Sequence, residues 1–561
     1  MEPTNMNQTR RDFLKHTATG IVTSPLLSQV SCMDAVQKKP NILLIMADDM
    51  GYSDIGCFGG EVNTPNIDRL AGNGIRFSQF YNAARCCPTR ASLMTGLYPH
   101  ESGVGRMTSR NNGPGYLGYL NDSCVTIPEV LSQADYFTGM AGKWHSGAVK
   151  KSWPENRGFQ RFYGIHHWVD SYFKVLSDCE IFENGEIVIP QTDNPGSDNP
   201  GDDKEWYTTD VFTDKAIEHI SEALDQGKPF FQYVAYNAPH WPLEAHDEFI
   251  EKYLDMYEEG YEELRKSKFK KMQEMGLISQ KWNLPDPVTP EWDTLTDSEK
   301  HDTRFRRAIY AAQIEIMDHN IGRIVEHLEN NGELDNTIIL FISDNGCSAE
   351  PETNWFGYQW GKNTKENYQD WRKNSVRKGA SQGMAWALTS NAPFQKYKKF
   401  AHEGGISTPL IVHWPERIPN TGSIDDSPGH IVDIMATCLD VAGVMYPEEL
   451  NGNQIRKQRG ISLTKNLRGE QSREQRELFW EHEDHAAIRR GPWKIVTVDC
   501  SNEDNWELYN IDNDRTATDD LSAEFPKMRS DLIALWEKTA FETDVLPKPD
   551  PAKAVRNPVD K

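Results

Sequence analysis

The sequence predicts an α/β fold: a large, mostly parallel, doubly wound sheet flanked by helices, followed by a smaller C-terminal α+β domain. Short apolar runs alternate with helical segments along most of the chain, which is typical of a parallel sheet with helices on both faces. Polar residues cluster directly after several of these runs, where open α/β sheets place their functional sites. After residue 443, strand-like segments separated by turns follow one another, which indicates an antiparallel sheet.

The expected elements of the large sheet begin with the run 41–47, which is apolar from Ile42 onward, as in a strand buried on both faces. Pro65 and Gly74 mark the start and the stop of the first helix. Further strands are expected at 75–77, 137–142, 228–236, 337–343 and 409–414, and further helices at 89–97 and 304–331. Residues 193–204 are expected to form a surface loop, and the highly charged segment 244–300 a solvated helical insertion.

The expected C-terminal domain consists of short strands and one closing helix. The strands are predicted at 478–481, 486–490, 493–498 and 506–510, and the helix at 525–541. We therefore predict a main domain at 40–443 that carries the site, an antiparallel-sheet subdomain at 444–545 and a tail at 546–561.

Residues 1–32 are predicted to be a targeting segment. The run Thr9-Arg10-Arg11-Asp12-Phe13-Leu14-Lys15 resembles a twin-arginine export signal, and a mildly apolar stretch to Leu27 follows it. Such a signal implies export by the twin-arginine machinery to the periplasm or the outside. A lipoprotein site at Cys32 is weakly indicated, because Gln29 fits that pattern badly. The alternative is a disordered basic tail.

The composition indicates a large, folded, acidic protein. The chain has 561 residues, of which 38% are hydrophobic, and it contains 16 tryptophans. Its formal net charge of −24 argues against general affinity for nucleic acids or anionic membranes. The nine cysteines show neither zinc-type spacing nor a dense disulfide pattern, and their pairing stays open.

One short run, Cys86-Cys87-Pro88-Thr89-Arg90, brings several reactive features together. Pro88 suits the first turn of a helix, where its missing N–H has no intrahelical partner. Cys86 is then expected just ahead of a helix N-terminus, where free N–H groups and the helix dipole attract an anion. Arg90, about one turn further, adds a cation that matches a tetrahedral oxyanion. The alternative is a pair of small buried cysteines opening a core helix.

This run, with Thr95-Gly96 after it, resembles the signature of the type I sulfatases, Cys-x-Pro-Ser/Thr-Arg followed by Thr-Gly. The resemblance implies that a formylglycine-generating maturation enzyme oxidises Cys86 to Cα-formylglycine, with Cys87 at the variable position. In the first step, one hydroxyl of the hydrated aldehyde then attacks sulfur. In the second step, the other hydroxyl loses its proton and sulfate is expelled. Arg85 departs from the usual residue before the cysteine.

The resemblance extends over nearly the whole chain after the targeting segment. Further stretches that look like bacterial arylsulfatases are 59–70, 310–318, 402–409 and 508–516. The implied fold is that of the alkaline-phosphatase superfamily, and the implied activity is that of a sulfatase, a sulfuric ester hydrolase. The substrates implied are small aryl or alkyl sulfates or sulfated saccharides.

Four oxygen-bearing side chains follow two of the expected strands: Asp48, Asp49, Asp344 and Asn345. Three carboxylates brought together repel one another, and Ca²⁺ or Mg²⁺ relieves this, because both ions prefer oxygen ligands. Taken singly, Asp-Asp is equally typical of a helix cap and Asp-Asn-Gly of a tight turn. The resemblance assigns these four residues to Ca²⁺, with an oxygen of modified Cys86 completing the shell.

The resemblance also implies a set of basic residues around the sulfate: Arg90, Lys143, His145, His240 and Lys398, with Lys399 as the alternative to Lys398. Taken singly, a lysine or histidine is more often a surface or core residue; together they supply the positive potential that a sulfate ester requires. Arg90 and Lys143 are expected to hold sulfate oxygens, and His240 or Lys398 to donate to the departing oxygen. Asp344 is the expected base, and His145 is expected to assist sulfate release.

Two other readings of this site stay open. The first is a phosphate or phosphonate monoester hydrolase with the same set of charges. The second is an exported, non-catalytic anion-binding protein in which Cys86 is never converted. Separately, His166, His167, Trp168 and Tyr172 either line a substrate entrance or form a buried aromatic cluster.

Overall fold

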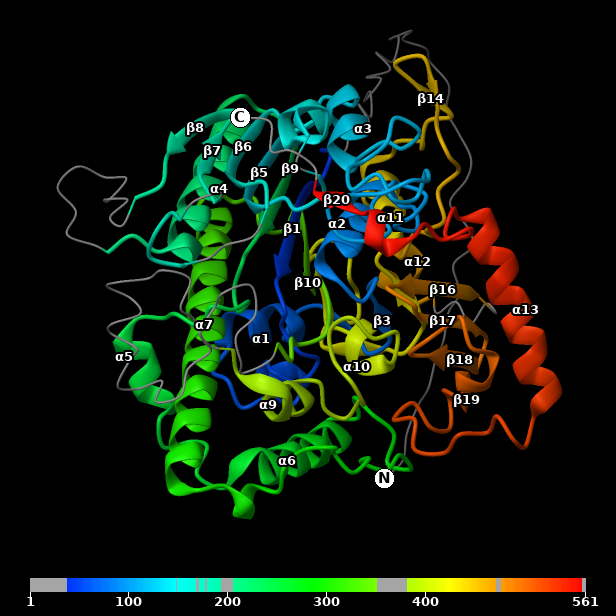
Figure 1. Cartoon of the computed structure of the whole chain (residues 1–561). Helices are drawn as coiled ribbons and strands as arrows, with labels where there is room; N and C mark the ends of the chain where they lie inside the picture. The colour runs from blue at the N-terminus through cyan, green and yellow to red at the C-terminus, as the bar shows by residue number, and fades with distance from the viewer. Residues whose placement is uncertain are drawn as a thin grey trace, which may run out of the picture. The chain divides into compact units, whose positions relative to one another are not determined.

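The structure, a computed structural model, describes residues 38–147, 149–167, 171–176, 179–192, 205–350, 381–470 and 476–556. Within these residues, one sheet of ten strands runs in the order β12-β2-β11-β10-β1-β9-β5-β6-β7-β8. Its strands from β10 to β8 are labelled in Figure 1. Its strands are β1 (Asn41–Ala47), β2 (Ile75–Phe77), β5 (Phe137–Lys143), β6 (Arg161–Ile165), β7 (Ile181–Glu183), β8 (Glu186–Ile189), β9 (Phe230–Ala235), β10 (Thr337–Ser343), β11 (Leu410–His413) and β12 (Ser423–Asp425). The five central strands from β10 to β6 are parallel, whereas β11, β7 and β8 introduce antiparallel pairs.

Strand β1 lies at the centre of the sheet and is buried on both faces. Leu43 and Ile45 pack into one hydrophobic core, and Ile42 and Leu44 pack into the other. Its parallel register with β10 pairs Ala47 with Ser343. The residues that follow each strand therefore leave the same edge of the sheet side by side.

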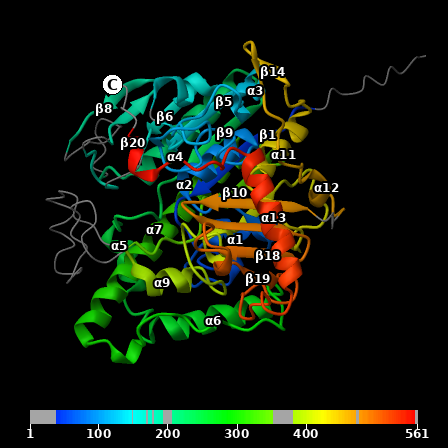
Figure 2. The ribbon, with the colours of Figure 1, turned by 45° about the vertical axis from the view of Figure 1, so that its right-hand side comes forward.

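Helices cover both faces of the sheet (Figures 1 and 2). One face carries α1 (Pro65–Gly72), α4 (Thr208–Asp225) and α7 (Asp297–Asn330), and the other carries α2 (Cys86–Thr95), α3 (Ile127–Gln133) and α11 (Asp433–Ala442). Thr296 and Glu299 form a capping box that starts α7, seven residues before the expected start. The predicted doubly wound α/β architecture is confirmed.

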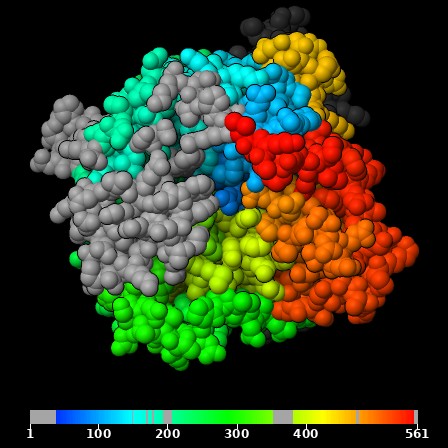
Figure 3. Space-filling model, viewed as in Figure 1, coloured from blue at the N-terminus to red at the C-terminus, as the bar shows by residue number. Residues whose placement is uncertain are grey.

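A second, four-stranded antiparallel sheet lies near the C-terminal end: β16 (Glu477–His482), β17 (His485–Arg490), β18 (Trp493–Thr497) and β19 (Glu507–Asn510). Helix α13 (Pro526–Glu542) covers one face, where Phe479 and Ile488 pack near Trp536. The other face packs through Trp480 against Tyr81 and neighbouring residues of the main body. The orange and red C-terminal residues form one continuous part of the surface beside residues near 400 (Figure 3).

The remaining described elements are short or peripheral to these layers. They are β3 (Phe80–Tyr81), β4 (Ser109–Arg110), β13 (Gly429–His430), β14 (Glu449–Leu450), β15 (Asn453–Gln454), β20 (Val555–Arg556), α5 (Asp247–Ile250), α6 (Gly260–Glu274), α9 (Gly383–Ser390), α10 (Glu403–Ile406) and α12 (Thr464–Leu467). Among the described helices, none is both long and apolar enough to cross a bilayer.

The charged segment 244–300 is partly helical and mostly exposed or half-buried, as its composition predicts, but it also buries a charge that the prediction missed. Helix α6 buries Tyr261, Met272 and the charged Lys268, which is 1% exposed. Lys268 lies 3.2 Å from Asp54 and 2.9 Å from Glu61, so its charge is neutralised inside the protein. The burial of Lys268 was not predicted because the partners that permit it are far away in sequence.

The targeting segment 1–32 and the loop at 193–204 lie outside the described residues. The boundaries 40–443, 444–545 and 546–561 stay predictions.

Candidate active site

The predicted oxygen donors meet at the ends of β1 and β10. Asp48, Asp49, Asp344 and Asn345 are all at most 1% exposed. The backbone N–H of Asp49 donates to Asp344 Oδ1 at 3.2 Å, and Asn345 Nδ2 donates to Asp49 Oδ1 at 2.6 Å. The parallel register of the two strands therefore brings together residues that lie almost 300 positions apart.

Helix α2 begins at Cys86 itself, with extended Arg85 as its N-cap residue. We expected Cys86 just ahead of the helix; Pro88 is the third helical residue, still within the first turn, where an N–H is not needed. Arg90 lies one turn on and is fully buried. Its Nη2 and Nε donate to Asp344 Oδ2 at 2.8 and 3.2 Å, and its Nη1 donates to the carbonyl oxygen of Lys143 at 2.8 Å.

Lys143 and Lys398 each approach a carboxylate of the acidic group. Lys143, at the end of β5, forms a close ion pair with Asp48. Lys398 Nζ lies 2.7 and 2.9 Å from the two carboxylate oxygens of Asp49. The alternative, Lys399, is 41% exposed and instead pairs with Glu483 at 3.4 Å. Of the two lysines, Lys398 is thus the one in contact with the acidic group.

His240 lies in the same cluster, with Nε2 3.5 Å from Asp49 Oδ2. Its Nδ1 lies 2.5 Å from the carbonyl oxygen of Trp241, which can only accept, so Nδ1 carries the proton of the neutral ring. Nε2 is the nitrogen that faces the acidic group.

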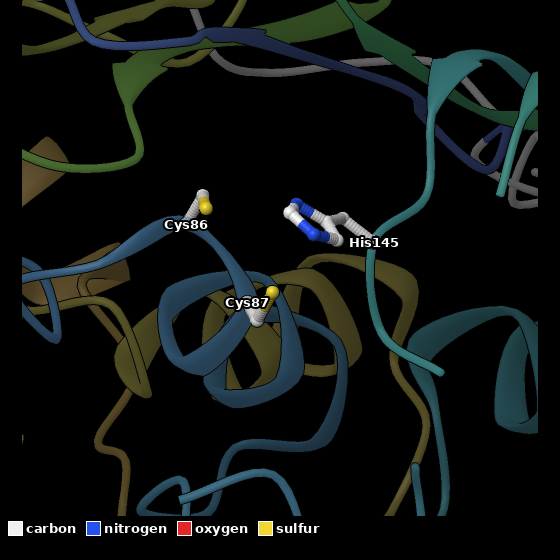
Figure 4. A group of neighbouring side chains, drawn as sticks. All are labelled: Cys86, Cys87 and His145. Carbon is white, nitrogen blue, oxygen red and sulfur yellow. The ribbon is translucent and has the colours of Figure 1, made fainter. Parts of the chain in front are cut away.

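His145 approaches the cysteines from the segment that follows β5 (Figure 4). A nitrogen of His145 and the sulfurs of Cys86 and Cys87 all lie within 4.8 Å of one another. Burial lowers the pKa of His145 to about 4. A hydrogen bond from Cys87 lowers the pKa of Cys86 against the effect of burial, and nearby His145, Lys143 and Lys398 lower it further. This thiol therefore lies in a positive environment at a helix N-terminus.

The acidic group is suited to a divalent cation. Asp48 Oδ1 and Asn345 Oδ1 are buried and accept no hydrogen bond from the described residues. Burial and the nearby charge of Asp48 raise the pKa of Asp344 well above its usual range. Burial opposes ionisation of Asp48 as well, but Lys143, His240 and Arg90 lower its pKa. Crowded carboxylates with unused oxygens are the ligand set that Ca²⁺ or Mg²⁺ takes.

The site also contains features that lie outside the predicted set of residues or that concern the backbone. Tyr310 Oη contacts the carbonyl oxygen of Asp49 at 3.1 Å and Asp54 Oδ2 at 2.7 Å. Asp49 and His145 have left-handed backbones, with φ of 67° and 51°. Tyr310 belongs to one of the family-like stretches, which was its one signal; no sequence pattern indicated the two strained backbones.

The candidate entrance residues are buried. His166 stacks on Trp153, with 4.2 Å between ring centroids, and packs against Phe182 at 4.1 Å. Tyr172 Oη donates to the carbonyl oxygen of His240 at 2.8 Å, so it supports the loop that presents this histidine. His167 is 5% exposed, and Trp168 lies outside the described residues. The arrangement is that of a buried cluster.

Comparison with known proteins gives two family matches. The family model named Sulfatase matches residues 40–444. A second model, N-sulphoglucosamine sulphohydrolase, C-terminal, matches residues 394–538.

Similar individual proteins include an uncharacterized sulfatase of Schizosaccharomyces pombe, 34% identical over 546 residues, covering 92% of this chain and 96% of that protein. The arylsulfatase of Klebsiella aerogenes is 33% identical over 445 residues, covering 77% of this chain and 92% of that protein. Among solved structures, Ps i-CgsB in complex with k-i-k-neocarrahexaose is similar with a TM-score of 0.64 and 27% identity, covering 90% of this chain and 94% of that one.

The family model spans most of the chain, and both relatives exceed 30% identity over more than two thirds of it. The chain is therefore a hydrolase of the sulfatase family, within the alkaline phosphatase superfamily.

Proposed function

We propose that the protein hydrolyses sulfate monoesters through a formylglycine derived from Cys86, next to a divalent metal ion, and that its natural substrate is a sulfated saccharide. The observation that carries this proposal is the position of Cys86. It lies at the N-terminus of buried helix α2, beside His145 and within reach of the charges of Lys143 and Lys398. Such a site attracts a tetrahedral oxyanion to a reactive side chain.

Two groups that the chain must acquire supply part of the chemistry. Asp48, Asp49, Asp344 and Asn345 would hold a Ca²⁺ or Mg²⁺ ion, which would polarise a sulfate oxygen. The hydrated aldehyde at residue 86 would supply the hydroxyl that attacks sulfur and the second hydroxyl that permits release.

The chain's own residues bind and orient the ester. Arg90 and Lys143 are proposed to hold sulfate oxygens, since both cations converge on the same buried acidic group that borders Cys86. Asp344 is the proposed base. Lys398 would donate to the departing oxygen, or His240 would do so once its Nε2, which faces the site, is also protonated. His145 is proposed to take the proton that must leave during sulfate release, which its position beside Cys86 supports.

A saccharide substrate is supported by the solved relative in complex with k-i-k-neocarrahexaose. The similarity to the Klebsiella arylsulfatase makes an aryl sulfate the natural assay compound.

The test compares p-nitrophenyl sulfate with p-nitrophenyl phosphate, using protein co-expressed with a formylglycine-generating enzyme. The proposal predicts a higher kcat/KM for the sulfate, and no sulfate turnover by Cys86→Ala. Cys438→Ala is the matched control, because Cys438 is also a buried thiol but belongs to α11. A preference for phosphate would favour the phosphate or phosphonate hydrolase instead, and binding of sulfate esters without turnover would favour an anion-binding protein.

We also propose export through residues 9–15, on the basis of the arginine pair Arg10-Arg11. Replacing both arginines with lysine should retain the protein inside the producing cell, as judged by fractionation and immunoblotting. Unchanged export of this variant would contradict the proposal.

A further inference from the structure

Arg85 immediately precedes Cys86 and is the N-cap residue of α2, with φ of −150° and ψ of 151°. Its side chain is 16% exposed. Burying a guanidinium is costly unless hydrogen-bond acceptors replace the water that it loses. The partners of this side chain therefore bear on what the site is built to bind.

Arg85 has few partners in the part of the chain that the structure describes. Its one ion contact there joins Nη2 to Glu350 Oε1 at 4.0 Å, which is beyond hydrogen-bond distance. Its Nε is buried and donates to no described residue. Within the described ranges, the planar fork of N–H donors next to the reactive residue thus has no close acceptor.

The neighbouring cations differ from Arg85 in this respect. Arg90 contacts Asp344 at 2.8 Å, and Lys398 contacts Asp49 at 2.7 Å. Further out, Glu483 lies between Arg106 at 3.2 Å and Lys399 at 3.4 Å, so one carboxylate serves two cations there. Arg85 therefore has a longer contact with a carboxylate than any of these neighbouring cations.

The reacting sulfate does not need Arg85. Under the proposed function, its oxygens are already held by Arg90, Lys143, the metal ion and the group that donates to the departing oxygen. Arg85 projects from the residue before position 86, so an anion bound to it belongs to the rest of the substrate.

We infer that Arg85 binds a second oxyanion, a carboxylate or a further sulfate, on the leaving-group side of the substrate. Guanidinium and these planar or tetrahedral oxyanions form bidentate, charge-assisted hydrogen bonds. The inference rests on the proposed function and narrows its substrate class to saccharides that carry an acidic group near the scissile sulfate. Arg85 is then a residue that determines specificity.

The experiment compares two aryl sulfates that differ in one substituent, a carboxylate or the corresponding neutral carboxamide. We expect Arg85→Gln to lower kcat/KM for the carboxylate substrate by about tenfold to a hundredfold, the range of a charge-assisted hydrogen bond. The carboxamide substrate should change by less than about threefold. Arg85→Lys should retain part of the preference, because it keeps the charge and loses the fork.

Rates are divided by the fraction of residue 86 that is converted, measured by peptide mass spectrometry, because Arg85 adjoins the modified position. The control is Arg69→Gln, which removes the same charge from α1, where Arg69 forms an exposed pair with Glu329 of α7. It should not change kcat/KM for either substrate. A second comparison measures kcat/KM for a monosaccharide monosulfate and for the same sugar with a second sulfate. This comparison distinguishes a sulfate from a carboxylate as the group that is bound.

Equal losses for the anionic and neutral substrates, or no loss for either, would overturn the inference while leaving sulfatase activity intact. Binding without turnover is measured by titrating the Cys86→Ser variant with each of the two aryl sulfates in a calorimeter. In that background the carboxylate compound should bind more tightly than the carboxamide, and Arg85→Gln should abolish the difference. Converted wild-type protein that hydrolyses no sulfate ester would contradict the proposed function instead, and the calorimetric comparison would still decide the role of Arg85.

Discussion

Asp49 connects most of the charged groups of the site. Its carboxylate contacts Lys398, His240 and Asn345, and its backbone N–H donates to Asp344. Its left-handed φ of 67° is unfavourable for a residue with a side chain, so surrounding contacts must hold it. Tyr310 provides one of them through its hydroxyl, 3.1 Å from the Asp49 carbonyl oxygen.

Tyr310→Phe should lower the free energy of unfolding by about 1–3 kcal/mol, because the hydroxyl that lies between two buried acceptors, the Asp49 carbonyl and the Asp54 carboxylate, is removed. Urea denaturation measures the change. Tyr446→Phe is the matched control: its buried hydroxyl has no hydrogen-bond partner among the described residues, so its removal should have little effect. Equal effects of the two variants would mean that the contacts of Tyr310 do not hold this loop.

At the scale of elements, α6 carries a buried cation to the loop that follows β1. Lys268 and Arg307 of α7 both contact Asp54 and Glu61, and all four side chains are at most 11% exposed. Asp54 also accepts from the backbone N–H of Gly51, three residues before it. The two helices thereby fix the loop on which Asp48 and Asp49 lie.

Lys268→Met should destabilise the protein by about 3–5 kcal/mol, because removing one member of a buried ion network leaves uncompensated charge. Chemical denaturation is the measurement. Lys270→Met, on the same helix but 79% exposed, should cost less than about 1 kcal/mol. If Lys268 were as solvated as Lys270, both variants would behave alike.

Helix α10 and the C-terminal sheet are joined by a second buried group of charges. Glu403 lies 2.7 Å from both Lys494 of β18 and Arg515, and all three side chains are at most 4% exposed. Burial opposes ionisation of Glu403, but these two cations lower its pKa from 4.5 to about 2. Since the folded-state pKa is depressed, the stabilisation is present above pH 4.5 and is lost as pH falls toward 2.

Glu403→Gln should therefore be less stable than wild type by about 3–5 kcal/mol near neutral pH. This difference should shrink between pH 4.5 and 2, as followed by guanidinium denaturation at several pH values. Glu477→Gln removes a carboxylate from an exposed pair with Arg490 on the same sheet and should change stability by less than about 1 kcal/mol. A Glu403 effect that is independent of pH would show that its charge is not the cause.

At the scale of the whole molecule, local sequence patterns predicted the strands well but did not predict most long-range contacts. Strands β1 and β10 match their predicted bounds, because a continuous apolar run is a strong signal for a doubly buried strand. The meeting of Asp48 and Asp344 followed from strand ends that share one edge of a parallel sheet. Lys268 was misjudged because Asp54, its partner, lies 214 residues away, and a charge run alone resembles a solvated surface.

The packing of the C-terminal sheet beside the site was also beyond sequence reasoning. Its four strands were predictable from short apolar runs and turns. Its position depends on one buried face, where Trp480 Nε1 donates to the carbonyl oxygen of Asn82 at 2.8 Å, close before the cysteine run. The sheet therefore supports the segment that presents Arg85 and Cys86.

The most direct test of the account is the chemical state of residue 86 in protein that turns over substrate. Batches with different extents of conversion are obtained by varying co-expression of the maturation enzyme, and peptide mass spectrometry gives the converted fraction in each. The account predicts that the rate on p-nitrophenyl sulfate rises in proportion to the formylglycine fraction and extrapolates to zero without it. Full activity in protein whose Cys86 is an unmodified thiol would contradict it.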